Sequence, residues 1–172
     1  MPVAQRAAHS QREWHHQSWR QADATVHVAA VCYRVRDDEI EFLLVKTRAG
    51  RWTFPKGRVD DDATRAAAAE REAYEEAGVH GRVEPLPFAT YLHSKAPHIR
   101  AAHAEFRVDA HLCEVYGLVA PEESYRNPTW FSPSKAKRRL HDDRRFHYGI
   151  ELSAVIDRAV ERIARRGSKS LH

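Results

Sequence analysis

The sequence predicts an α+β domain, a mixed sandwich in which helices pack on a sheet. Two observations indicate this fold class. Strand-like stretches lie on both sides of one strongly marked helix, and a helix with a single apolar stripe closes the pattern. The chain has 172 residues, of which 42% are hydrophobic and 30% charged, so one domain with a sizeable core is expected.

The composition divides the chain into three parts. We expect a polar arm over residues 1–22, one domain over residues 23–167 and a flexible tail over residues 168–172. The arm is rich in Gln, Arg and His and carries Trp14 and Trp19. Two tryptophans in a polar segment suggest that part of the arm docks on the domain or on another subunit. A homodimer is therefore one hypothesis, and the sequence does not decide it.

The first half of the domain begins with a predicted β-hairpin. Residues 25–35 are β-rich and apolar on both alternating sets, as in a central strand. After a polar turn, residues 40–48 form the expected antiparallel return strand. Residues 51–59 then predict a short strand, followed by a sharp change of direction at Pro55 and Gly57.

A helix with well-marked ends follows. Residues 63–77 are dense in strong helix formers. Asp60, Asp61 and Asp62 offer an N-cap and complement the positive end of the helix dipole. Gly78 stands where a glycine in the left-handed conformation ends a helix.

The second half of the domain returns to strands. Residues 79–94 predict an irregular strand region that Pro85 and Pro87 interrupt. Residues 103–112 alternate apolar and polar side chains, which is typical of a strand with one buried face. After a polar loop, residues 129–131 predict one more short strand.

Two helices are expected at the end of the domain. Ser132 and Pro133 form an N-cap and N1 pair that opens a basic helix. Residues 149–165 predict the last helix, whose apolar stripe is most simply a face that docks on the core. The stripe consists of Leu152, Val155, Ile156, Ala159, Val160 and Ile163.

Cysteine content and charge limit the class of protein. Cys32 and Cys113 stand far apart in apolar, strand-like stretches, which predicts buried free thiols. The net charge is +4, and its excess lies in residues 135–145 and 158–169. This excess suits a polyanionic partner, from a polyphosphate metabolite to RNA, or simply a solvated helix face. No apolar run approaches the ~20 residues that span a bilayer, and the first residues lack a secretory signal, so we expect a cytoplasmic protein.

Three glutamates on the first predicted helix need an explanation. Glu72, Glu75 and Glu76 stand at i, i+3 and i+4, a spacing that stacks them on one helical face. Like charges at this spacing repel, so a cation nearby would make the cluster favourable. Mg²⁺ takes hard oxygen ligands together with water and substrate phosphate oxygens. The alternative is a solvent-exposed acidic face.

The residues around these glutamates resemble the Nudix box, G-x5-E-x7-R-E-U-x-E-E-x-G-U, in which U is apolar. The matching residues are Gly57, Arg71, Glu72, Ala73, Glu75, Glu76, Gly78 and Val79. One position departs, because Ala63 stands where the family has its first glutamate. Asp60, Asp61 or Asp62 could replace that carboxylate. The resemblance extends over residues 24–166 and implies an α/β/α sandwich with a mixed central sheet.

The resemblance also implies a reaction, the hydrolysis of a diphosphate linked to a nucleoside or a related group with Mg²⁺ or Mn²⁺. By position, Glu72, Glu75 and Glu76 would bind metal, together with the backbone carbonyl of Lys56. Arg71 would orient the glutamates through a salt bridge, and Glu72 stands where some relatives have a base. Some relatives complete the site with a glutamate outside the box, for which the candidates are Glu105, Glu122 and Glu123.

Two segments of the chain suggest a substrate class. Residues 51–62 are similar to the approach to the box in dinucleoside polyphosphate hydrolases, and residues 126–140 to a segment of the diphosphoinositol polyphosphate hydrolases. The favoured substrate is therefore a small polyphosphate, specifically a dinucleoside polyphosphate. The candidate phosphate-binding residues are Arg48, Arg51, Lys56 and Arg58. The alternatives are an RNA 5′-pyrophosphohydrolase, which would require a nucleic-acid partner, and a non-catalytic ligand-binding regulator.

Overall fold

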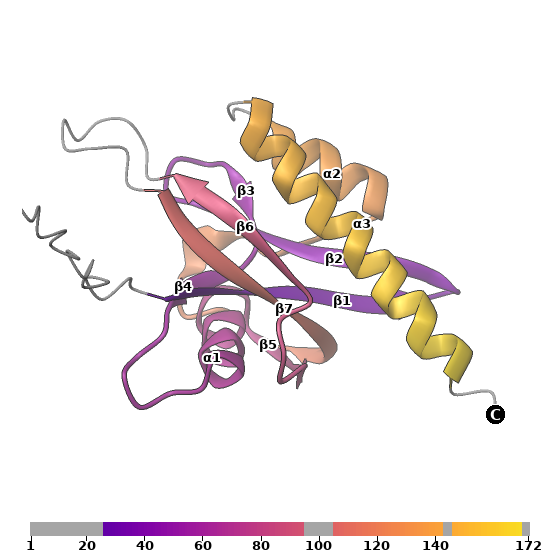
Figure 1. Cartoon of the computed structure of the whole chain (residues 1–172), viewed down its shortest axis with the longest axis horizontal. Helices are drawn as coiled ribbons and strands as arrows, with labels where there is room; N and C mark the ends of the chain where they lie inside the picture. The colour runs from indigo at the N-terminus through magenta and orange to yellow at the C-terminus, as the bar shows by residue number, and fades with distance from the viewer. Residues whose placement is uncertain (1–25, 95–104, 143–145, 170–172) are drawn as a thin grey trace, which may run out of the picture.

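A mixed sheet lies between helices on its two faces, as the computed structural model in Figure 1 shows. Helix α1 covers one face, and helices α2 and α3 cover the other. The predicted α+β fold, an α/β/α sandwich, is confirmed. The structure describes residues 26–94, 105–142 and 146–169, so the predicted polar arm lies outside the described residues.

The elements follow the predicted order closely. They are β1 (His27–Arg36), β2 (Glu39–Lys46), β3 (Trp52–Thr53), β4 (Lys56–Arg58), α1 (Arg65–Ala77), β5 (Val79–Val83), β6 (Ala89–Ser94), β7 (Glu105–Leu118), the 3₁₀ helix η1 (Ser124–Arg126), β8 (Thr129–Phe131), α2 (Pro133–His141) and α3 (Phe146–Lys169). Described β-strands run in the order β3-β2-β1-β7-β5, with β4 beside β1, β6 beside β7 and β8 beside β2.

The pairing of β1 determines the layout of the sheet. β1 and β2 form the predicted antiparallel hairpin, whose turn places Asp37 and Asp38 at φ angles of 51° and 63°. On its other side β1 pairs in parallel with β7, which makes the sheet mixed. β4 pairs antiparallel with the start of β1, with Lys56 opposite Ala29 and Gly57 opposite Val28. This pairing places Lys56 and Gly57 at the face that α1 covers.

The two faces of the sheet carry separate apolar cores. The predicted stripe of α3 is buried or partly buried against one face, so its docking role is confirmed. On the other face α1 contributes only small residues, which allow the helix axis to approach the strands closely. These residues are Ala68, Ala69, Ala73 and Ala77. Cys32 and Cys113 are buried and free, as predicted, and they lie opposite each other on β1 and β7.

The N-terminus of α1 differs from the prediction, because Asp60, Asp61 and Asp62 do not cap the helix. Thr64 is the N-cap, and its hydroxyl accepts a hydrogen bond from the backbone N–H of Ala67 at 3.1 Å. A threonine directly before the first helical residue is the residue that can reach the free N–H groups. The aspartates lie in the turn before it.

The other helix ends show smaller differences. Gly78 ends α1 at φ 66°, and its N–H donates to the carbonyls of Ala73 and Tyr74, which confirms the predicted C-terminal glycine. Helix α2 begins at Pro133 as predicted, but the side chain of Ser132 makes no capping hydrogen bond. Helix α3 covers Phe146–Lys169 and is longer than the predicted 149–165. Across the described segments, no helix has the length and apolar character needed to cross a membrane.

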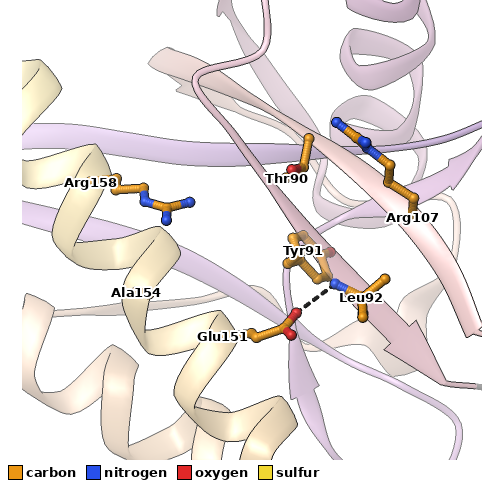
Figure 2. Close-up of a pocket in the computed structure, with 7 residues that line it drawn as sticks. All are labelled: Thr90, Tyr91, Leu92, Arg107, Glu151, Ala154 and Arg158. Carbon is orange, nitrogen blue, oxygen red and sulfur yellow. Dashed lines mark hydrogen bonds between the residues drawn. The ribbon is translucent and has the colours of Figure 1, made fainter.

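A hollow lies along strand β6, where helix α3 passes the edge of the sheet (Figure 2). The backbone N–H of Leu92 points out of the sheet and donates to the Glu151 carboxylate at 2.6 Å. In Figure 2, Arg158 of α3 and Arg107 of β7 lie on either side of Thr90. Glu151 therefore satisfies an edge donor that no neighbouring strand takes up, and it ties α3 to β6.

Replacement of Glu151 by Ala is expected to lower the free energy of unfolding by about 1 kcal/mol, because the Leu92 N–H loses a charged acceptor. Urea denaturation measures this change. Glu161→Ala is the matched control on the same helix, since its contact with Arg165 is an exposed i,i+4 pair. That control should change stability by less than about 0.5 kcal/mol. Equal effects of the two substitutions would show that the contact with β6 contributes nothing.

Candidate active site

The three predicted glutamates lie on α1 where this helix faces β4. Their side chains differ in exposure: Glu76 is 7% exposed and Glu72 12%, whereas Glu75 is 41% exposed. Two of the three carboxylates are therefore held against the sheet, and the third remains open to solvent. An exposed acidic face, the alternative considered from the sequence, does not describe Glu72 and Glu76.

Glu72 lies directly against the backbone of Gly57. A β-carbon built on Gly57 would lie 2.1 Å from Oε1 of Glu72, so only glycine leaves room for the carboxylate. Burial raises the pKa of Glu72, an effect that the hydrogen bond and charge of Arg71 oppose. The box glycine thus has a steric role, since it makes the space in which a buried glutamate lies.

Glu76 is held by two donors from outside α1. Its Oε2 accepts a hydrogen bond from the backbone N–H of Lys56 at 3.1 Å, and its Oε1 forms an ion pair with Arg126. Burial raises the pKa of Glu76 from 4.5 to about 7, although the charge of Arg126 and the Lys56 hydrogen bond act in the opposite direction. A carboxylate this buried requires a cation close by to remain ionised.

Arg71 links the box helix to the loop before it. Its guanidinium contacts the Asp60 carboxylate, donates to the Arg58 carbonyl at 3.0 Å, and lies 3.3 Å from Glu72 and 3.8 Å from Glu75. The hydrogen bond with Glu72 is the largest cause that raises the pKa of Arg71. The arginine therefore contacts two of the three glutamates, as an orienting role requires.

The contact with Asp60 bears on the position where the chain departs from the box. Ala63 has no carboxylate, and its backbone N–H donates to the Asp60 carbonyl in a tight turn. Of the three aspartates proposed as replacements, Asp60 is the one whose carboxylate contacts Arg71. Asp60 thus supplies an acidic partner for the box arginine from three residues earlier in the chain.

Arg126 is a site residue that the sequence did not identify. It lies in η1, is 14% exposed, and contacts Glu76 directly. Its Nε donates to Glu123 at 2.5 Å, and its Nη1 lies 3.4 Å from the carbonyl oxygen of Lys46. The only signal available was its place at the start of a segment similar to a known group of hydrolases. No local rule joins a loop arginine to a helix far earlier in the chain.

The predicted residues outside the box glutamates differ in how they contact the site. Glu123 is joined to Glu76 through Arg126, whereas Glu122 donates its backbone N–H to the Glu75 carbonyl at 3.1 Å. The third candidate, Glu105, lies at the start of β7, and its side chain lies outside the described residues. Arg48 lies over the Tyr125 ring at 4.9 Å and so faces η1.

The remaining predicted phosphate ligands relate to the glutamates in different ways, and, against the larger effect of burial, the charge of Lys56 lowers the pKa of both Glu72 and Glu76. Lys56 contributes the N–H that binds Glu76, while a metal-binding role for its carbonyl stays a prediction. Arg58 contributes the carbonyl that Arg71 contacts. Arg51 lies in the turn after β2, where its backbone bonds to Thr47, and no described contact brings its side chain to the glutamates.

The donor set fits a hard divalent cation. Carboxylate oxygens of Glu72, Glu75 and Glu76 are the ligands that Mg²⁺ and Mn²⁺ prefer. Among the described residues, no three His, Cys, Asp or Glu side chains converge as a metal cage. Guanidinium groups contact two of the carboxylates instead: Arg71 that of Glu72, and Arg126 that of Glu76. Arg126 supplies positive charge at the Glu76 carboxylate.

The raised pKa of Glu76 predicts how the stability of the metal-free protein depends on pH. Between pH 4.5 and about 7 the folded state binds a proton that the unfolded state releases, so stability falls as pH rises through this range. The loss attributable to Glu76 is on the order of 3 kcal/mol. Urea denaturation in EDTA at pH 5, 6 and 7 measures the slope, and Glu76→Gln should remove this part of it. An unchanged slope in that variant would assign the pH dependence to other groups.

Comparisons with known proteins agree with this geometry. A family model described as NUDIX domain matches residues 25–150. A C. elegans Ap4A hydrolase in a binary complex is similar, with a TM-score of 0.63 and 21% identity over 81% of this chain and 98% of that chain. A NUDIX hydrolase from Nitrosomonas europaea is similar with a TM-score of 0.58 and 19% identity, over 78% of this chain and 86% of that chain. The NUDIX domain of Shewanella oneidensis NrtR, complexed with ADP ribose, is similar with a TM-score of 0.59 and 18% identity, over 81% of this chain and 88% of that chain.

Proposed function

Because the chain belongs to the Nudix family, we propose that it is a metal-dependent hydrolase of a phosphoanhydride bond in a polyphosphate, specifically a dinucleoside polyphosphate. The observation that carries the proposal is the state of the box glutamates. Glu72 is seated against Gly57, and Glu76 is seated against the Lys56 N–H, so the box is assembled as well as present in the sequence.

The chemistry needs little beyond charge and position. A bound Mg²⁺ or Mn²⁺ would neutralise the negative charge that keeps hydroxide away from the anhydride, and it would lower the pKa of a bound water. The residues of the chain hold that arrangement. Glu72, Glu75 and Glu76 provide the oxygen ligands, and Arg71 fixes two of them from the side. Glu72 is also the candidate base for the attacking water.

A long, highly charged substrate suits the cations beside the box. Arg48 and Arg126 both lie over the Tyr125 ring, at 4.9 and 5.0 Å from its centre. Guanidinium groups bind phosphate oxygens through paired hydrogen bonds, so a row of phosphates gains more from this arrangement than a single phosphate does. The structural likeness to an Ap4A hydrolase agrees with this choice, although at 21% identity it supports the fold only. The cytoplasmic location and the homodimer stay predictions.

Release of phosphate or nucleotide tests the proposal. The substrates are diadenosine polyphosphates, diphosphoinositol phosphates, ADP-ribose, nucleoside triphosphates and 5′-triphosphate RNA, each with Mg²⁺, with Mn²⁺ and with EDTA. We expect metal-dependent turnover that is highest for the diadenosine polyphosphates. Turnover of another class would correct the substrate and keep the reaction. Absence of turnover on every substrate, with ligand still bound, would favour a non-catalytic regulator.

An RNA substrate is the second candidate, and helix α2 is the observation that favours it. Lys135, Arg138 and Arg139 are exposed on this helix. Binding of RNA through such a surface would weaken steeply as salt rises, whereas turnover of a dinucleotide at a recessed site would change much less. A salt series on both substrates therefore separates the two functions.

A further inference from the structure

Arg126 is the buried cation that faces the glutamates of the proposed metal site. It is 14% exposed, and its three donor groups have three different partners. Nη2 pairs with Glu76, Nε donates to Glu123, and Nη1 approaches the Lys46 carbonyl. Glu123 and the Lys46 carbonyl therefore help to hold the Arg126 side chain in place, in addition to Glu76.

The Glu76 carboxylate cannot bind Arg126 and a divalent cation tightly at the same time. Glu76 accepts the Lys56 N–H at Oε2 and contacts Arg126 at Oε1, so a metal must share one of these two oxygens. A guanidinium and a divalent cation on one carboxylate would lie within a few ångströms and repel each other strongly in a site this buried. Metal binding therefore requires the Nη2 contact to open.

The partners of Arg126 allow this opening without unfolding of the loop. When Nη2 leaves Glu76, the bond from Nε to Glu123 and the contact with Lys46 remain. Arg71 differs in this respect, since its other partners are Asp60 and the Arg58 carbonyl, and it has no described contact with Glu76. Its long contact of 3.8 Å with Glu75 also leaves that carboxylate free to bind metal.

We propose that Arg126 is the internal counter-ion of Glu76 in the metal-free protein, and that the metal must displace it. Arg126 thereby sets the affinity for Mg²⁺ or Mn²⁺ and holds the Glu76 carboxylate in position until metal arrives. This inference rests on the proposed function, because it requires Glu76 to be a metal ligand. A site whose ligand is shared in this way binds metal more weakly than its oxygen donors alone would allow.

The test is the affinity of the whole protein for Mn²⁺, measured at pH 8.5 by electron paramagnetic resonance of free Mn²⁺, without substrate. We expect Arg126→Met to bind Mn²⁺ about tenfold more tightly than the wild-type protein. The matched control is Arg48→Met, which also removes one positive charge beside Tyr125, at a residue with no described contact with Glu76. Its affinity should change less than about threefold.

A second measurement needs no substitution. The Nε–H signal of Arg126 in a ¹⁵N-labelled wild-type protein is assigned by its disappearance in Arg126→Lys. Addition of Mg²⁺ should shift this signal in proportion to occupancy, since the guanidinium loses one carboxylate and keeps the other. An Arg126 signal that stays unchanged at saturating Mg²⁺ would overturn the inference even if Arg126→Met did not fold.

The outcomes separate this inference from the proposed function. If Glu76→Gln loses Mn²⁺ binding while Arg126→Met leaves it unchanged or weaker, the metal site stands and the counter-ion role of Arg126 fails. If Glu76→Gln binds Mn²⁺ as the wild-type protein does, the metal site itself fails. Equal tightening in Arg126→Met and Arg48→Met would reduce the role of Arg126 to general charge and would overturn the proposal of a direct exchange.

Discussion

The Glu76→Gln variant is expected to hydrolyse its substrate at least about 10³-fold more slowly than the wild-type protein at saturating Mg²⁺. A metal ion contributes several kcal/mol to a phosphoryl transition state, and each 1.36 kcal/mol is a factor of ten in rate. The neutral amide has nearly the same shape, and its oxygen can still accept the Lys56 N–H, while its NH₂ group loses the ion pair with Arg126. The loss would therefore report the missing charge rather than a missing side chain.

The matched control is Glu70→Gln on the same helix. Glu70 is exposed and contacts neither β4 nor Arg126 in the described structure, and its substitution should change the rate less than about twofold. Thermal unfolding of both variants in EDTA shows whether the fold is intact. Retention of more than a tenth of the wild-type rate by Glu76→Gln would remove this glutamate from the metal site.

Local sequence rules were sufficient for α1 and its glutamates. The spacing i, i+3 and i+4 determines that Glu72, Glu75 and Glu76 share a face, whatever packs around them. Even so, the N-cap was predicted wrongly. Asp60, Asp61, Asp62 and Thr64 can all cap a helix by residue type, and only the register of the first turn selects Thr64. Helix ends are decided by one residue, so composition cannot resolve them.

Contacts between distant segments could not be predicted in this way. Asp109 is one of the polar residues in the alternating stretch 103–112, yet it is buried in an ion pair with Arg65 of α1 at 2.5 Å. The contact of Arg126 with Glu76 likewise depends on how η1 packs beside β2 and α1. Polar residues that are buried by tertiary packing look the same in a sequence as polar residues in water. The missed part of the site consists of such residues.

The second large effect is expected from Gly57→Ala, which should reduce turnover by about 10- to 100-fold while the fold remains intact. The added β-carbon would lie 2.1 Å from Oε1 of Glu72 and 2.3 Å from its Cδ, so the carboxylate must move. The three nearest atoms all belong to the end of the flexible Glu72 side chain, and none of them is backbone. The substitution therefore displaces one proposed ligand and leaves the strand pairing of β4 in place.

Gly117→Ala is the control, because a β-carbon there meets nothing within 4 Å. Its turnover and unfolding temperature should match those of the wild-type protein. The decisive comparison is between rate and stability in Gly57→Ala. A rate loss with unchanged unfolding in EDTA means that the glycine exists to seat Glu72. A parallel loss of rate and stability would instead mean that Gly57 supports β4. A displaced carboxylate can be hydrated at the edge of the site and costs little stability, whereas a displaced strand loses its backbone hydrogen bonds.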